Sequence, residues 1–260
     1  MRLFLASIML STLAFRDAGS QCHPTAARVQ TTARTPLKVR LDALKHRYVL
    51  GHPVQLRVTA VNQSESPICT RLFLEPQDGD LYLSISDDGQ KFVPYLGPDW
   101  EIVEVEGLVR LESGEKRQAI FSVLWNLDRF SKLGASSNFL AFPAPGSYVI
   151  KAQVMSGFGT IDSNAVKVDL VAPSGSDETI WQQIKTDSRL ARFIQDPRPD
   201  GKDAEIVAGH LRGLLKVYAG SRYAAEFNAT LEDYHHRKEV MKATRPQTSQ
   251  HGSSVEDRFH

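Results

Sequence analysis

The residues with the chemistry for catalysis or metal binding in this sequence lack the spacing that such chemistry needs. His235 and His236 are adjacent, so on a helix they point roughly 100° apart and cannot share one ion in the usual way. The sequence contains no HExxH metal motif and no GxSxG nucleophile motif. The short acidic segments, such as Asp78-Gly79-Asp80, are explained by the preference of Asp and Gly for turns, without a metal site. We therefore predict no catalytic residue, no metal site and no cofactor.

Cys22 and Cys69 are the only cysteines, and three states are open to them. In an oxidising compartment an even count indicates one disulfide. Cys22 also follows an apolar run, as the modified cysteine of bacterial lipoproteins does, although Gly19-Ser20-Gln21 departs from that pattern at two positions. The third state is two free or intermolecular thiols.

A candidate binding loop contains three aromatic residues within nine positions: Phe92, Tyr95 and Trp100. Pro94, Gly97 and Pro98 lie among them, which favours an irregular segment. Such a loop offers aromatic faces to a sugar or a peptide. The alternative is that the rings fill the end of a hydrophobic core.

The N-terminal residues 1–20 predict a secretory signal peptide. Arg2 is followed by an apolar run from Leu3 to Phe15, which is too short to span a membrane, and then by small residues. The alternatives are a buried helix or a retained anchor. We expect residues 21–36 to form a polar, flexible N-terminal arm and residues 245–260 a disordered tail. No other stretch is apolar enough to span a membrane, so we expect an exported protein, periplasmic or secreted in preference to lipid-anchored.

The charge balance is close to neutral. The whole chain carries 31 basic and 30 acidic residues. Removing residues 1–20 removes Arg2, Arg16 and Asp17, which leaves 29 of each sign. A neutral chain lacks the electrostatic footprint of a protein that binds nucleic acid or anionic membranes. We therefore predict no nucleic-acid partner.

Any site must be positioned by regular secondary structure, and the first such elements lie between Leu37 and Val61. There, apolar and polar residues alternate in two separate runs. Such alternation is the pattern of a half-buried strand. Further short runs continue to residue 172, with Asp87-Asp88-Gly89-Gln90 as a hairpin turn. Eight or nine strands at near-regular spacing indicate a β-sandwich over residues 37–172.

This region resembles bacterial exported immunoglobulin-like domains. The resemblance rests on the block Tyr48–Val54, on the turn Asn62-Gln63-Ser64, and on Pro145–Tyr148 and Ser163–Val166 before the last two strands. It implies an immunoglobulin-like sandwich and an envelope setting. These motifs are turn chemistry, so they imply no activity.

Residues 176–244 predict a small module of three helices. Ser176 and Asp203 begin the first two, and Gly220-Ser221 separates the second from the third. The junction between the last two resembles the helix-turn-helix joint of tetratricopeptide-type repeats. No second copy follows at the repeat period, which favours one helical hairpin. We expect its apolar residues to face a partner, namely Trp181, Leu211, Leu215 and Tyr218.

The sequence thus predicts an all-β immunoglobulin-like sandwich followed by a small helical module. The function we expect is non-enzymatic binding or scaffolding of another protein in the cell envelope or extracellular space. The alternative is a protease-inhibitor-like domain or an accessory domain of an exported hydrolase system. A binder requires exposed apolar residues on the helices, an inhibitor requires a protruding loop within 126–146, and an enzyme requires a pocket of converging titratable groups.

Overall fold

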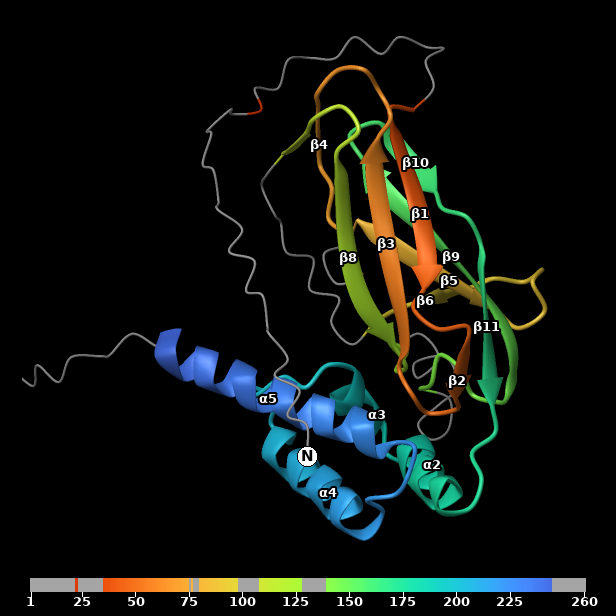
Figure 1. The fold of residues 1–260 in the computed structure, drawn as a ribbon, viewed down its shortest axis with the longest axis vertical. Coiled ribbons are helices and arrows are strands. Elements are labelled where there is room, and N and C mark those ends of the chain that lie inside the picture. Colours follow the sequence, from red (N-terminus) through yellow and green to blue (C-terminus); the bar gives the residue numbers. More distant parts are fainter. Residues whose placement is uncertain are drawn as a thin grey trace, which may run out of the picture.

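The computed structural model describes Cys22 and residues 35–74, 76, 80–97, 108–127 and 139–244. The expected signal peptide, most of the N-terminal arm, the C-terminal tail and Trp100 lie outside these residues. Within them, the chain forms a β-rich domain followed by four helices (Figure 1).

Three sheets make up the β domain. The first has the order β1 (Leu37–Ala43), β3 (Val54–Asn62), β8 (Lys116–Val123). The second has the order β2 (Arg47–Val49), β11 (Val166–Val171), β9 (Gly146–Ser156), β5 (Leu81–Ser86), β6 (Val93–Tyr95), with β10 (Gly159–Asp162) paired to β9. A two-stranded sheet joins β4 (Ile68–Thr70) and β7 (Val109–Leu111). The two larger sheets lie face to face, and β4 lies at the end remote from the helices (Figure 1).

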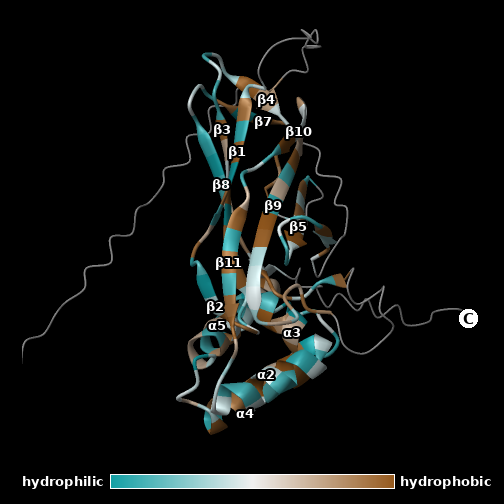
Figure 2. Ribbon diagram, turned by 90° about the vertical axis from the view of Figure 1, so that its right-hand side faces the viewer, coloured by the Kyte–Doolittle hydropathy of each residue, from teal (hydrophilic) through white to brown (hydrophobic). Residues whose placement is uncertain are grey.

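The alternation predicted over residues 37–61 is confirmed. Leu37, Val39 and Leu41 are buried while Lys38 and Arg40 are exposed. Pairing of β1 with β3 is antiparallel, so the apolar rows of both strands lie on the same face. The same alternation of hydrophobic and hydrophilic residues is visible along β11 (Figure 2). Burying side chains of this size contributes about 1.5–3 kcal/mol each.

The second sheet is mixed, which the alternation does not predict. Strand β2 runs parallel to β11, whereas the other strand pairs of the described residues are antiparallel. The backbone amide of Leu50 extends this pairing by donating to Val171. Tyr48 in β2 is buried, and its hydroxyl donates to the Gln55 carbonyl and accepts from the Lys45 amide. The short strand is thereby fixed to the beginning of β3.

The predicted hairpin turn at Asp87–Gln90 is confirmed, since Ile85 of β5 pairs with Val93 of β6. The Asp88 carboxylate accepts from the amides of Gln90 and Lys91 and from the Ser86 hydroxyl. These three bonds lower the pKa of Asp88 to about 2. The carboxylate therefore closes the turn throughout the neutral range.

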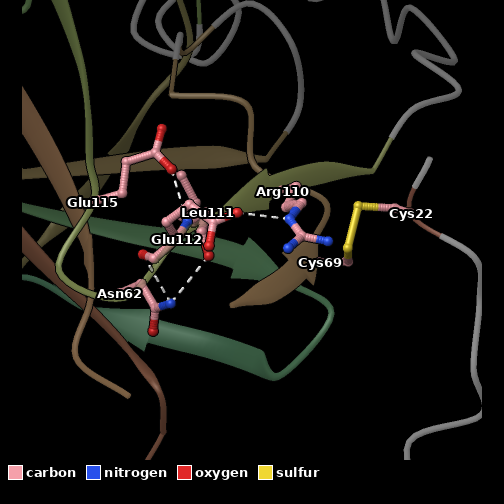
Figure 3. Close-up of a disulfide and its surroundings, with 7 residues drawn as sticks. All are labelled: Cys22, Asn62, Cys69, Arg110, Leu111, Glu112 and Glu115. Atoms are coloured by element: carbon pink, nitrogen blue, oxygen red, sulfur yellow. Dashed lines mark hydrogen bonds and ion pairs between the residues drawn. A yellow bond between two sulfur atoms is a disulfide. The ribbon is translucent and has the colours of Figure 1, made fainter. Parts of the chain in front are cut away.

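Asn62 and the disulfide fix the end of the β domain that is remote from the helices (Figure 3). The Asn62 amide donates to the carbonyls of Leu111 and Glu112, which joins β3 to the segment after β7. Cys22 and Cys69 form a disulfide with their Cα atoms 5.9 Å apart. With both sulfurs in this bond, neither is a free thiol.

Four helices follow where the sequence predicts three: α2 (Ser176–Thr186), α3 (Ser188–Gln195), α4 (Ala204–Val217) and α5 (Ala224–Thr244). The first predicted helix is divided at Asp187. This residue has extended backbone angles, and its carboxylate accepts from the amides of Arg189 and Leu190, so it ends α2 and caps α3. Within the described residues, no helix is both long enough and apolar enough to cross a membrane.

Candidate functional site

The helical module is fixed to the β domain at the turn between β2 and β3. The Tyr223 hydroxyl donates to the Leu50 carbonyl, and the Tyr223 ring stacks on His52 with centroids 4.5 Å apart. Gly51 has φ +93°, and the Trp181 ring covers it so closely that an added Cβ would lie 2.8 Å from a ring carbon. Glycine is therefore required at this position by both conformation and contact.

A second contact joins α3 to the β domain through Gln195. Its Oε1 accepts from the amides of Leu124 and Trp125 at 2.7 and 2.6 Å, and its Nε2 donates to the Tyr95 hydroxyl at 2.6 Å. Residues about 70 to 100 positions apart in sequence are thus held by one side chain. The two domains share a single hydrophobic core.

The expected aromatic binding loop is not formed as predicted. Tyr95 is 3% exposed, because its ring is buried in the core and its hydroxyl is bonded to Gln195. Phe92 is half-buried, with the Lys151 ammonium 4.1 Å from its ring centroid. Trp100 lies outside the described residues. For Tyr95 the alternative holds, in which the ring fills the end of the core.

The junction includes the buried Asp177 and the partly buried His52, and the pKa values of both are shifted. The Asp177 carboxylate accepts from the Ser221 hydroxyl, the Arg222 amide and the Arg222 guanidinium. Burial opposes its charge, but these bonds outweigh burial and lower the pKa of Asp177. Burial, followed by the charge of Lys45, lowers the pKa of His52 to about 4. His52 is therefore neutral at pH 7, and its buried Nε2 has no hydrogen-bond partner among the residues that the structure describes.

The prediction that four apolar helix residues face a partner is wrong for two of them. Trp181 is 5% exposed and Leu211 is fully buried. Leu215 and Tyr218 are partly buried and pack against the same core. The helices are amphipathic as expected, but their apolar faces are covered by the chain's own β domain and by neighbouring helices.

The opposite side of α4 is exposed, and it carries large hydrophobic residues in solvent. Ile206 and Val217 are 67% and 69% exposed, the highest values among the large hydrophobic residues described. Gly209 and Gly213 lie between them, one turn apart, and a Cβ added at either would meet no heavy atom of the described residues within 4 Å outside the backbone of α4 itself. We refer to Ile206, Gly209, Gly213 and Val217 as the α4 face. Its spacing is visible in the sequence once the inward face is known.

A charged hollow of roughly 350 Å³ lies between α3 and the beginning of α4. Arg189 lies 3.7 Å from Asp203, and Arg198 lies 2.8 Å from Asp196, so these charges largely neutralise one another. The hollow's lining has no hydroxyl, thiol or imidazole side chain. Within the described residues, no three acidic, His or Cys side chains are grouped to hold a metal ion.

Comparisons with known proteins show only weak likenesses. No family model matches the chain, and no curated protein matches it. Among solved structures, the alkylpurine DNA glycosylase AlkC of Pseudomonas fluorescens has a TM-score of 0.30 at 13% identity, with 54% of this chain matching 32% of that one. The sporulation control protein Spo0M of Bacillus subtilis has a TM-score of 0.30 at 17% identity, over 55% and 51% of the two chains.

A CARDB domain from Pyrococcus furiosus has a TM-score of 0.27 at 14% identity, over 52% of this chain and 87% of that domain. This chain therefore matches about a third of the glycosylase and half of the sporulation protein, but most of the CARDB domain. TM-scores and identities this low carry no argument about function.

Proposed function

We propose that this chain is an exported, non-enzymatic binding or scaffolding protein, in which an immunoglobulin-like β domain carries a helical module that binds another protein through the α4 face. The export part of the proposal is supported by the apolar N-terminal run and by the disulfide, since disulfides persist mainly in oxidising compartments. The immunoglobulin-like assignment is supported by two facing sheets of mostly antiparallel strands.

The observation that carries the binding role is the composition of the α4 face. Each glycine inside a helix costs about 1 kcal/mol relative to alanine. No contact with the described part of the chain requires Gly209 or Gly213, because the space around both is open there. Glycine has no Cβ and therefore permits close approach to the helix backbone, and Ile206 and Val217 supply apolar contacts beside it. An apolar helix of a partner protein fits this surface.

The junction explains how such a surface is presented. Trp181, Tyr223 and Gln195 fix the helices to the β domain, so the apolar faces that point inward are unavailable to a partner. What remains outward on α4 is held in one orientation. A rigid, pre-organised surface loses less conformational entropy on binding than a mobile one.

The test compares capture of partners by the mature chain and by a double variant, Ile206→Asp with Val217→Asp. Both side chains are exposed, so the variant is expected to fold with an unchanged circular dichroism spectrum. Its matched control, Met155→Asp with Val240→Asp, changes two other exposed apolar residues. We expect a specific envelope protein to be captured by the wild type and the control but not by the α4 variant.

Equal capture by all three proteins would refute the α4 face as the binding surface. A change from dimer to monomer in the α4 variant, without loss of another protein, would show that the partner is a second copy. Intact-mass measurement of the exported protein tests the processing, for which we expect a chain that begins at Gln21.

A further inference from the structure

The outer face of the first sheet carries a cluster of four cationic side chains. Lys38 and Arg40 project from β1, Arg57 from β3 and Lys116 from β8, around a hollow of roughly 290 Å³. Gln63 and Gln118 also line it. We call these six residues the cationic face. It lies on the β domain and includes no residue of the helical module.

Strand register brings these side chains together. Lys38 pairs with Val61, and Val61 pairs with Lys116, so the two lysines lie in one row across three strands. Neighbouring strands are about 4.8 Å apart, which places the backbones of the two lysines roughly 10 Å apart. Two residues further along the strands, Arg40 and Gln118 lie on either side of Thr59 in a second such row. Alternate residues share a face, so all of these side chains point outward.

Within the described residues, three of these four cations lack an ion-pair partner. Arg40 forms an ion pair with Asp42 at 2.8 Å. Lys38, Arg57 and Lys116 form no ion pair with any residue that the structure describes. Asp42 is also the one acidic residue that lines the hollow. A cluster of like charges without counter-charges raises the local potential even in a nearly neutral chain, and it attracts anions.

The uncharged residues of the hollow indicate which anion fits. Gln63, Gln118 and Thr59 provide amide and hydroxyl groups, which both donate and accept hydrogen bonds. Such groups complement hydroxyls, while the Arg57 guanidinium matches a carboxylate in two parallel hydrogen bonds. A polysaccharide built of uronic-acid residues alone combines a carboxylate with free hydroxyls in every residue. We propose that the cationic face binds a uronic-acid polysaccharide.

This proposal shares only the exported setting with the proposed function, and it does not depend on the α4 face. Its test is calorimetric titration of the full chain with oligogalacturonate, beside the fully methyl-esterified form of the same oligosaccharide. The ester removes the charge and keeps the hydroxyls. We expect binding of the acid and none of the ester, with affinity that falls as salt is added.

A charge-reversed variant locates the site: Lys38→Glu, Arg57→Glu and Lys116→Glu. Each exposed pair is worth up to about 1 kcal/mol, or about fivefold in affinity, so loss of three pairs should weaken binding by up to about a hundredfold. Repulsion between the introduced carboxylates and the ligand adds to this loss. The matched control, Arg47→Glu, Lys167→Glu and Lys185→Glu, has the same net charge and alters exposed cations elsewhere. It should bind as the wild type does.

Three results would overturn the proposal. Equal loss in both triple variants would mean that binding follows net charge alone. Equal or tighter binding of a dextran sulfate oligosaccharide, which carries no uronic acid, or of single-stranded DNA would show that hydroxyl-rich uronates are not selected. Absence of binding to oligogalacturonate at low salt would remove the site altogether. Binding that survives in the Ile206→Asp, Val217→Asp variant separates this surface from the α4 face.

Discussion

Replacing the two glycines of the α4 face by alanine should make the chain more stable and a poorer binder. Gly209 and Gly213 lie inside α4, and an added Cβ at either position meets no described atom within 4 Å beyond the helix's own backbone. Alanine in place of glycine stabilises a helix interior by about 0.5–1 kcal/mol per position. The double variant should therefore gain about 1–2 kcal/mol, and its midpoint temperature should rise by about 2–4 °C for each kcal/mol.

The assay pairs thermal and urea unfolding, followed by circular dichroism, with capture of the partner. The added methyl groups keep a partner backbone away from α4, so capture should weaken while stability rises. Gly114→Ala is the control, because Gly114 also has open space but lies in a turn at φ +74°. It should lower stability by about 1 kcal/mol and leave capture unchanged. A lower midpoint for the double variant, or unchanged capture by it, would refute the reasoning.

Three further predictions concern the joints of the fold. Tyr223→Phe leaves the Leu50 carbonyl without its donor, so urea unfolding should show a loss of about 1–2 kcal/mol, and an unchanged midpoint would contradict this. Replacing Cys22 and Cys69 by serine opens a loop with a sequence separation of 47, which should cost up to roughly 4 kcal/mol. Reductant should lower the free energy of unfolding of the wild type and leave that of the serine variant unchanged. A wild type whose stability is unaffected by reductant would argue against the disulfide. The folded-state pKa of His52 is lowered from 6.5 to about 4. Its contribution to the free energy of unfolding is therefore complete above pH 6.5 and is lost as the pH falls to 4, by at most about 3 kcal/mol. His52→Asn should flatten the dependence of unfolding free energy on pH in that window, and an equally steep dependence would exclude His52 as its source.

Local patterns in the sequence account well for the strands. Alternation over residues 37–61 predicts β1 and β3 correctly because one face of each strand is buried and the other is in solvent. The Asp-Gly turn before β6 is equally local. The parallel pairing of β2 with β11 joins residues more than a hundred positions apart, and no local pattern encodes it.

The helix faces show where periodicity stops being informative. The pattern identifies a buried side of α2 and α4, and Trp181 and Leu211 do lie on it. Periodicity does not say whether a partner or the same chain covers that side. Here the turn leaves space for the Trp181 ring only because Gly51 has no Cβ. This contact can be seen only in the folded structure.

Gln195 is a similar case. Its side chain accepts from two backbone amides of the β domain at separations of 70 and 71 residues. A polar residue at the end of a short helix carries no sequence signal of such a role. The glycines of the α4 face, in contrast, follow a helical spacing that can be read from sequence once the inward face has been assigned.

The most direct test of the account is photo-crosslinking in cells from a single position beside the α4 face. A benzophenone amino acid replaces Lys216 on α4, and in a parallel experiment it replaces Lys185 on α2, both exposed positions. We predict a crosslink to one envelope protein from position 216, its loss when Ile206→Asp is added, and no such product from position 185. A crosslink of equal yield from both positions, or one that persists with Ile206→Asp, would contradict the α4 face as the surface that binds the partner.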